Sequence, residues 1–250
     1  MIRIPILRVG GDEAFPAVET ALREPNGLLA AGGDLRPERL LRAYAQGIFP
    51  WFSPGEPVLW WSPDPRMVFA TQAMHVPRRL ARWLRSCDWR LAADRDFAAV
   101  MRECAAPRDG HSGTWITPAM RGAYEQLHAL GHAHSVEVYA GETLVGGIYG
   151  VAVGRMFYGE SMFSRASNAS KVALLALAWR LRAWGWPLID AQVSSEHLQT
   201  LGAQELPRRA FCTRIAGLVG QPGRIGPWHG ELDALRPAQL AQPVAATGTP

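Results

Sequence analysis

The segment GIFPWFSPGEPVLWWSPDPR, residues 47–66, constrains the fold more than any other part of this chain. Its five prolines exclude a helix, because proline removes a backbone donor and clashes with the preceding turn. Its apolar residues do not alternate with polar ones, so it is not a simple strand. The segment predicts a rigid loop with flat aromatic faces at Trp51, Trp60 and Trp61. A single tryptophan more often cements a domain junction, but several such faces suit a nucleobase, which gains roughly 1–3 kcal/mol from stacking.

Length and composition predict a globular protein of one or two domains. The chain has 250 residues, of which 48% are hydrophobic, enough for a substantial core. It lacks any run of roughly 20 apolar residues and any N-terminal apolar region of signal-peptide type, so we expect a cytoplasmic protein with no membrane association. The three cysteines have no CxxC spacing, which argues against a disulfide framework or a zinc ribbon.

Arginines gather in the segment HVPRRLARWLRS, residues 75–86, which has the pattern of a helix. Its apolar residues fall on one stripe, and Arg78, Arg82 and Arg85 project from the opposite face with Arg79 at the flank. A solvated charged face is the ordinary interpretation of such a pattern. However, like charges without acidic partners repel one another unless an anion lies over them. The net charge of +4 permits a polyanionic partner without requiring one.

Periodicity and turn residues divide the chain into three parts. We expect a small N-terminal domain over residues 1–64, a larger domain over 65–230 and a disordered tail over 231–250. The larger domain should contain helices at 97–104, 118–130 and 168–184 and strands at 135–139, 143–153, 156–158 and 187–193. A meander, a buried helix and a further strand predict an α+β fold whose sheet carries helices on both faces.

Two motifs superficially suggest ligand sites. His128, His132 and His134 lack a further ligand at a suitable spacing, which favours capping and packing roles over a metal site. The glycines of GGIYG, residues 146–150, lie inside a strand pattern rather than between a strand and a helix. They indicate a bulge or a close backbone approach instead of a phosphate loop.

Acidic and amide side chains remain as candidates for the chemistry. Alternation in LIDAQV, residues 188–193, places Asp190 and Gln192 on one side of a strand that otherwise looks buried. A buried polar pair is costly unless it is hydrogen-bonded, so the pair is either satisfied structure or a site. Glu160, in an expected turn at GESMFS, is a second candidate carboxylate.

The aromatic segment and six further strings together resemble the leucyl/phenylalanyl-tRNA–protein transferase family. The strings are REPNGLLAAGGDL (23–35), GTWIT (113–117), GHAHSVEV (131–138), GESMFS (159–164), LIDAQV (188–193) and LGAQELPRR (201–209). They follow the family's order and cover most of residues 23–209. The resemblance implies an N-acetyltransferase-like (GNAT) fold for the larger domain, with a mixed, mainly antiparallel sheet.

The resemblance also implies a reaction. Leu or Phe, and less well Met, would pass from aminoacyl-tRNA to the α-amine of proteins that begin with Arg or Lys, which marks them for N-end-rule degradation. The ester of aminoacyl-tRNA is already activated, so neither a ribosome, ATP, a metal ion nor any other cofactor is needed. An α-amine has a pKa of about 7.7–8, so part of it is already nucleophilic. No sequence feature fixes the oligomeric state, and we expect a monomer.

The resemblance assigns roles to particular residues. Asp190 and Gln192 would form an amine-orienting proton relay supported by Glu160, and Trp51 and Trp115 would contact the terminal adenosine. The four arginines of the 75–86 helix would contact tRNA phosphates. The amino-acid pocket would be lined by Ile148, Phe157, Met162, Leu177, Leu181 and Ile189. Leu177 and Leu181 depart from the family, which often has phenylalanine there, and Ile148 stands where methionine is familiar, so we expect a roomier pocket.

Two other functions remain open from the residues alone. A CoA-dependent acyltransferase would share the fold, but it needs a glycine-rich turn for pyrophosphate where this chain has SRASNAS, residues 164–170. A non-catalytic RNA-binding protein would share the arginines and tryptophans, but it would have no use for Asp190 and Gln192.

Overall fold

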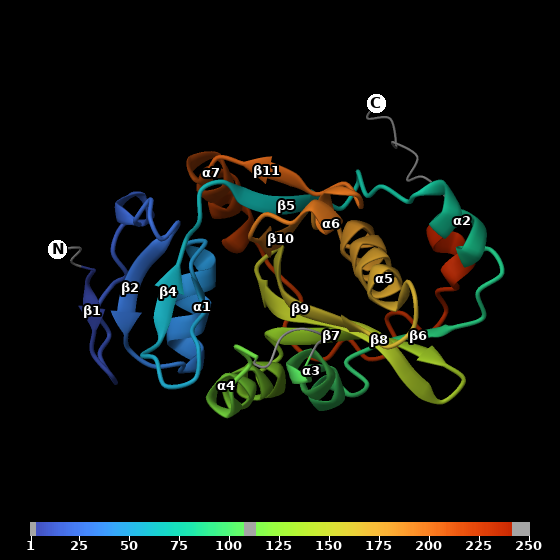
Figure 1. Cartoon of the computed structure of the whole chain (residues 1–250), viewed down its shortest axis with the longest axis horizontal. Coiled ribbons are helices and arrows are strands. Elements are labelled where there is room, and N and C mark those ends of the chain that lie inside the picture. The colour runs from blue at the N-terminus through green and yellow to red at the C-terminus, as the bar shows by residue number, and fades with distance from the viewer. Residues whose placement is uncertain (1–3, 108–113, 242–250) are drawn as a thin grey trace.

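Two sheets make up the framework of the computed structural model, which describes residues 4–107 and 114–241 (Figure 1). The smaller sheet has the order β1 (Ile6–Leu7), β2 (Leu28–Gly32), β4 (Leu59–Trp61), β3 (Phe49–Pro50). The larger has the order β11 (Gln204–Leu206), β5 (Arg66–Ala70), β10 (Leu188–Gln192), β9 (Met156–Ser164), β8 (Thr143–Val153), β7 (Ala133–Ala140), β6 (Arg90–Ala93). The chain passes from one sheet to the other between Trp61 and Arg66, at the end of the aromatic segment.

The larger sheet is mixed and mainly antiparallel, as the sequence predicts. Among the described strands of this larger sheet, only β9 and β10 pair in parallel, with Leu188 to Asp190 opposite Met156 to Tyr158. β9 then continues to Ser164 while β10 ends at Gln192. The two strands therefore separate beyond Tyr158, and an opening forms between them.

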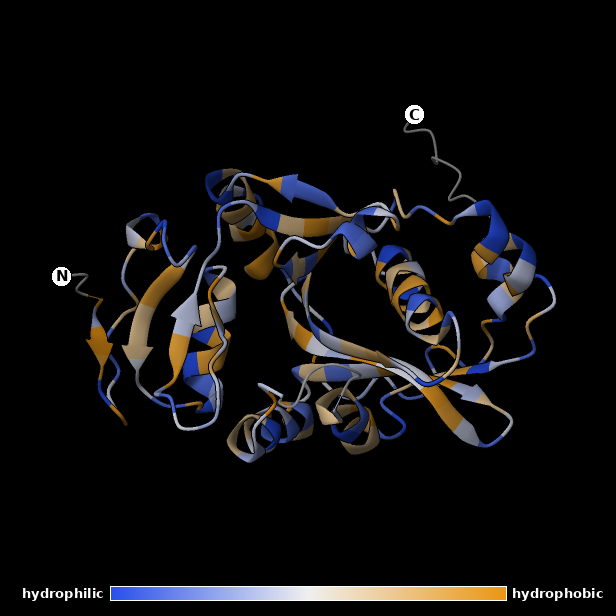
Figure 2. Ribbon diagram, viewed as in Figure 1, coloured by the Kyte–Doolittle hydropathy of each residue, from blue (hydrophilic) through white to orange (hydrophobic). Residues whose placement is uncertain are grey.

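Helices cover both faces of the larger sheet (Figure 1). α5 (Ala169–Ala183) lies on one face, and α3 (Phe97–Ala105) and α4 (Pro118–Ala129) lie on the other. α4 begins where expected, because the Thr117 hydroxyl accepts a hydrogen bond of 3.2 Å from the backbone N–H of Met120. Figure 2 shows apolar residues along α5 and on the strands beneath it, as a buried helix requires. Within residues 4–107 and 114–241, no helix has the length and apolarity to cross a bilayer.

Three of the remaining α-helices lie toward the two ends of the molecule. α1 (Pro37–Ala45) packs on the smaller sheet beside α7 (Arg208–Val219), and α2 (Arg78–Leu84) lies at the opposite end (Figure 1). The short α6 (Glu196–Gln199) follows β10. Trp60 is fully buried and its indole N–H donates to the Gly32 carbonyl of β2, so this tryptophan has a packing role within the smaller sheet. One core cluster contains residues of both sheets, so the two sheets pack as neighbours without separate cores.

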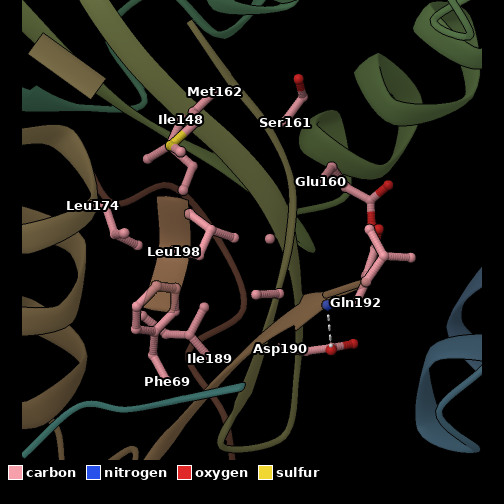
Figure 3. Close-up of a pocket in the computed structure, with 13 residues that line it drawn as sticks. Phe69, Ile148, Glu160, Ser161, Met162, Leu174, Ile189, Asp190, Gln192 and Leu198 are labelled. Carbon is pink, nitrogen blue, oxygen red and sulfur yellow. Dashed lines mark hydrogen bonds between the residues drawn. The ribbon is translucent and has the colours of Figure 1, made fainter. Parts of the chain in front are cut away.

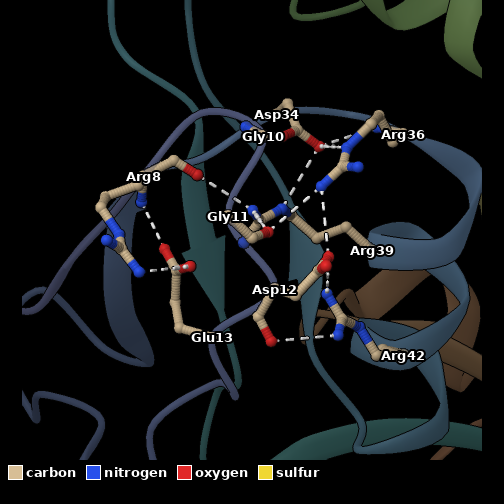
Figure 4. Close-up of polar contacts among 9 residues, drawn as sticks. All are labelled: Arg8, Gly10, Gly11, Asp12, Glu13, Asp34, Arg36, Arg39 and Arg42. Carbon is tan, nitrogen blue, oxygen red and sulfur yellow. Dashed lines mark hydrogen bonds and ion pairs between the residues drawn. The ribbon is translucent and has the colours of Figure 1, made fainter.

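A polar network around Asp34 joins α1 to the N-terminal segment (Figure 4). The Asp34 carboxylate accepts hydrogen bonds from the backbone N–H of Gly10 at 2.7 Å and from the guanidinium groups of Arg36 and Arg39. Arg39 is fully buried and also donates to the Arg8 carbonyl at 3.0 Å. Burial acts to raise the pKa of Asp34, but the hydrogen bonds outweigh it and lower the pKa to about 2. The network therefore stabilises the fold only while Asp34 is ionised.

The prediction of a disordered tail is wrong for residues 231–241. Leu232, Leu235 and Leu240 are buried in the core, and the short 3₁₀ helix η2 (Pro237–Ala241) packs against α2 and α5. The segment mixes charged and apolar residues, but its leucines all turn toward the same core, and composition alone does not reveal this. The rest of the predicted tail, residues 242–250, lies outside the described residues.

The histidines and glycines have the packing roles that the sequence favours. The rings of His134 and Trp228 stack with centroids 3.6 Å apart, and those of His128 and Phe97 stack at 4.3 Å. A Cβ at Gly150 would lie 2.1 Å from the carbonyl oxygen of Tyr158, across a bulge between β8 and β9. Only glycine permits this close backbone approach.

Candidate active site

Glu160 is the meeting point of three elements that are distant in the sequence. It lies within β9, not in a turn as the sequence suggested, because β9 extends to Ser164. Its carboxylate accepts hydrogen bonds from the Tyr44 hydroxyl at 2.8 Å, the Gln192 side-chain amide at 2.7 Å and the Tyr124 hydroxyl at 2.9 Å. The two tyrosine hydroxyl oxygens also lie within hydrogen-bond distance of each other, so either hydroxyl can donate to the other in place of Glu160. Tyr44 comes from α1 and Tyr124 from α4, and sequence reasoning missed both, because no local pattern joins residues that lie 80 positions apart.

The environment of Glu160 balances burial against hydrogen bonding. Burial raises the pKa of Glu160 to about 7, although the hydrogen bonds from Tyr44, Tyr124 and Gln192 act to lower it. Near neutral pH the carboxyl group therefore exists in both protonation states. Such a group can accept or release a proton under ordinary conditions.

Asp190 is paired with a buried arginine that sequence reasoning missed. Its two carboxylate oxygens accept from Nε and Nη2 of Arg66 at 2.8 and 2.6 Å, and both side chains are 0% exposed. Arg66 also donates to the Gly47 carbonyl and lies against the rings of Phe49 and Phe211. This arginine ends the aromatic segment, so the loop and β10 are held together by one bidentate ion pair. Both carboxylate oxygens of Asp190 therefore already accept hydrogen bonds from Arg66.

Gln192 leaves the regular alternation of β10. The pairing of β10 with β5 shifts between Asp190 and Gln192, and Gln192 has φ +64°, in the left-handed region. Its backbone N–H donates to Asp190 at 2.8 Å while its side chain reaches Glu160. Backbone strain of this kind persists where surrounding contacts enforce it, and it is concentrated at functional sites. Through the backbone N–H of Gln192, the Arg66–Asp190 pair thus sets the position of the Gln192 side-chain amide.

An apolar cavity of about 140 Å³ opens between the separated strands β9 and β10 (Figure 3). Three residues of the expected amino-acid pocket line it, Ile148, Met162 and Ile189, together with Phe69, Leu174 and Leu198. Glu160 and Gln192 form its polar end.

The other three expected pocket residues, Phe157, Leu177 and Leu181, are buried in the core and do not line this cavity. At 1.5 Å per residue along α5, Leu177 and Leu181 lie about 4.5 and 10.5 Å beyond Leu174, the residue that does line it. The presence of leucine at these two positions, where the family often has phenylalanine, therefore does not widen the described cavity directly, contrary to our expectation.

A second cavity, of about 130 Å³, carries the aromatic residues. It is lined by Trp51, Trp115, Phe49 and Pro50, and Glu160, Gln192 and Val193 belong to its wall as well as to that of the apolar cavity. Trp51 is 44% exposed, and its carbonyl accepts a hydrogen bond from the Trp61 indole, which fixes the loop. The structure thus brings Trp51 and Trp115 together beside the two polar residues.

The arginines of α2 lie far from these cavities. Figure 1 places α2 at the end of the molecule opposite α1. Arg78, Arg79, Arg82 and Arg85 are all exposed, and no carboxylate among the described residues forms an ion pair with them. The expected free basic face is therefore present.

An apolar cavity and an aromatic cavity thus meet at a carboxylate and an amide, an arrangement that suits a group-transfer enzyme. Comparison with known proteins identifies the family. The chain belongs to the leucyl/phenylalanyl-tRNA–protein transferase family: the family model matches residues 68–216, and the model of the family's N-terminal domain matches residues 33–64. It is an enzyme, an aminoacyltransferase that acts between tRNA and protein.

Relatives of this family are close in sequence over most of the chain. The leucyl/phenylalanyl-tRNA–protein transferase of Xanthomonas campestris pv. campestris (strain B100) is 61% identical over 215 residues, 86% of each chain. That of Xylella fastidiosa (strain M12) is 60% identical over 208 residues, 83% of this chain and 85% of its own. Among solved structures, L-PGS from Bacillus licheniformis is similar with a TM-score of 0.38 and 9% identity over 67% of this chain and 53% of its own. That likeness is too weak to assign the GNAT fold, so the fold is established only as α+β.

Proposed function

We propose that this enzyme transfers Leu or Phe, and less well Met, from aminoacyl-tRNA to the α-amine of proteins that begin with Arg or Lys. The observation that carries the proposal is that the apolar and aromatic cavities share Glu160, Gln192 and Val193. A single aminoacyl-adenosine could occupy both, with its ester beside the two polar residues. The names of the relatives support Leu and Phe as donors.

The two cavities divide the donor between them. An apolar side chain that is unbranched at Cβ fits among Ile148, Met162 and Leu174, where a residue branched at Cβ would crowd the strands. The terminal adenine would stack on Trp51 or Trp115. The α2 arginines would hold backbone phosphates of the same tRNA farther along. Most of the acceleration would come from positioning the ester and the amine, since well-oriented groups reach very high effective concentrations.

The chemical step is attack of the acceptor amine on the ester carbonyl carbon. A C–N bond forms, the C–O bond to the 3′ oxygen breaks, and the proton lost by the amine balances the one gained by that oxygen. In this proposal the Gln192 amide orients the amine and Glu160 takes up its proton. Asp190 contributes as a positioning residue, through Arg66 and the backbone N–H of Gln192.

The acceptor would be held by charge. Ionised Glu160 borders both cavities and can attract a positively charged first residue, which favours Arg or Lys over neutral residues. We further propose that the enzyme works as a cytoplasmic monomer with a GNAT-like larger domain, and that the transfer marks its acceptors for N-end-rule degradation.

The decisive test is transfer with purified components. The enzyme is incubated with labelled Leu-tRNA and two acceptor proteins that differ only in their first residue, Arg or Ser, without ATP or ribosomes. Label should enter only the Arg protein, and end-group analysis should place Leu before Arg. Equal labelling of both proteins would refute the acceptor assignment, and absence of labelling from every aminoacyl-tRNA would refute the transfer itself.

A further inference from the structure

A third cavity, of about 210 Å³, lies away from the two that border Glu160. It is formed by β6, β7 and the segment after Trp228, and it is lined by Arg90, Leu91, Ala92, Arg95, Tyr139, Asp233 and Arg236. Three guanidinium groups and one carboxylate therefore border a single hollow. None of these residues belongs to the apolar or the aromatic cavity.

The charges in this cavity are only partly compensated. Arg90 forms an exposed ion pair of 2.9 Å with Glu142. Neither Arg95 nor Arg236 forms an ion pair with any carboxylate in the described part of the chain. Arg90 and Arg95 lie over the Tyr139 ring, with Cζ 5.7 and 5.4 Å from its centroid, and this contact holds both guanidinium groups at the cavity. Three guanidinium groups around one hollow, two of them held against Tyr139, match the charge and the oxygen geometry of a phosphate.

The cavity adjoins the basic face of α2. Arg236 immediately precedes η2, and η2 packs against α2. Arg90 opens β6, only a few residues after α2 ends at Leu84. The cavity and the exposed arginines of α2 therefore lie at the same end of the molecule, remote from α1 (Figure 1). A polyanion that covers α2 would meet the cavity as it continues along this end.

We propose that this cavity is a second phosphate-binding site, which takes a backbone phosphate of the tRNA through Arg95 and Arg236. The inference rests on the proposed tRNA substrate and extends its binding surface to the C-terminal segment. This gives the ordered residues 231–241 a role besides packing, since they supply Arg236 to the site while their leucines hold η2 on α2. The cavity is distant from the chemistry, so it contributes to affinity and not to the transfer step.

The experiment measures binding of deacylated tRNA as a function of salt concentration. Arg95→Ala and Arg236→Ala should each weaken binding and reduce the slope of log K against log salt by roughly 0.7–0.9, the amount expected for one lost phosphate contact. Arg214→Ala is the matched control, since Arg214 is exposed on α7 near the opposite end and its loss changes the net charge equally. Thermal unfolding of each variant confirms that it is folded. Because the tRNA is deacylated, the result does not depend on whether the enzyme transfers amino acids.

The outcomes separate the sources of phosphate. A reduced slope in the Arg95 and Arg236 variants but not in the Arg214 variant supports an RNA phosphate. An equal reduction in all three shows a general effect of charge and overturns the site. Inorganic phosphate gives a second measurement: if it raises the Tm of the wild type more than that of the double variant while tRNA slopes are unchanged, the cavity takes a small free phosphate and the RNA assignment is wrong. If neither measurement shows an effect, the proposal is overturned entirely.

Discussion

The buried pair of Arg66 and Asp190 allows a quantitative prediction for Asp190→Asn. The amide keeps the shape of the side chain but removes its charge, and it leaves the guanidinium at 0% exposure without a countercharge, with one amide oxygen, the Gly47 carbonyl and two aromatic rings as its remaining partners. Removal of one partner of a buried ion pair costs about 3–5 kcal/mol of unfolding free energy. For a chain of this size each 1 kcal/mol lowers Tm by about 2–4 °C, so the variant should melt about 6–20 °C below the wild type.

Urea unfolding followed by tryptophan fluorescence measures this change. The matched control is Glu142→Gln, the same carboxylate-to-amide change in the exposed pair with Arg90, which should have little measurable effect. The double replacement Arg66→Met and Asp190→Leu should recover part of the loss, because no unpaired charge stays buried. A loss below about 1 kcal/mol in Asp190→Asn would refute the view that this pair is a dry, essential contact.

The same variant tests the positioning role of Asp190. Asparagine keeps one oxygen that can accept from the Gln192 N–H, but its NH2 group faces the Arg66 guanidinium, so the side chain should shift, loosen the left-handed backbone at Gln192 and displace the Gln192 side chain from Glu160. At a temperature where the variant is folded, kcat for transfer should fall at least tenfold while affinity for aminoacyl-tRNA changes little. A parallel collapse of tRNA affinity would contradict this assignment.

Four further predictions address other parts of the molecule. Because the pKa of Glu160 is about 7, kcat/KM should rise with pH through this value, and Glu160→Gln should remove that limb of the pH profile. Arg78→Ala should reduce the slope of log K against log salt for tRNA binding by roughly 0.7–0.9. An unchanged slope would show that this face of α2 is an ordinary solvated surface that contacts no phosphate. Leu174→Phe should fill the apolar cavity and lower kcat/KM for phenylalanyl-tRNA relative to leucyl-tRNA, whereas Leu177→Phe should leave that ratio nearly unchanged. Asp34 has a folded pKa of about 2 against an ordinary 3.8, so it contributes about 2 kcal/mol above pH 4 that is lost as the pH falls toward 2; acid titration of Asp34→Asn should lack this loss.

Local signals in the sequence were sufficient for most elements. Pro118 with the Thr117 cap, and Gly131 after the last turn, mark α4 within one residue at its end, because helix termini depend on neighbouring backbone groups. The strands β7 and β8 and the helix α5 likewise follow from periodicity and turn residues. Long identical strings also placed the chain in its family. None of these inferences needs a contact between distant residues.

Tertiary structure decided how the site residues are used. The sequence named Asp190, Gln192 and Glu160 but not Arg66, Tyr44 or Tyr124, because a buried carboxylate acquires its partners only when the loop, α1 and α4 fold against the sheet. Because of these partners, Asp190 is fully buried in an ion pair. Glu160 instead borders two cavities and has a pKa of about 7. The ordered C-terminal segment was missed for the same reason: whether Leu232, Leu235 and Leu240 leave water depends on a core that other parts of the chain provide.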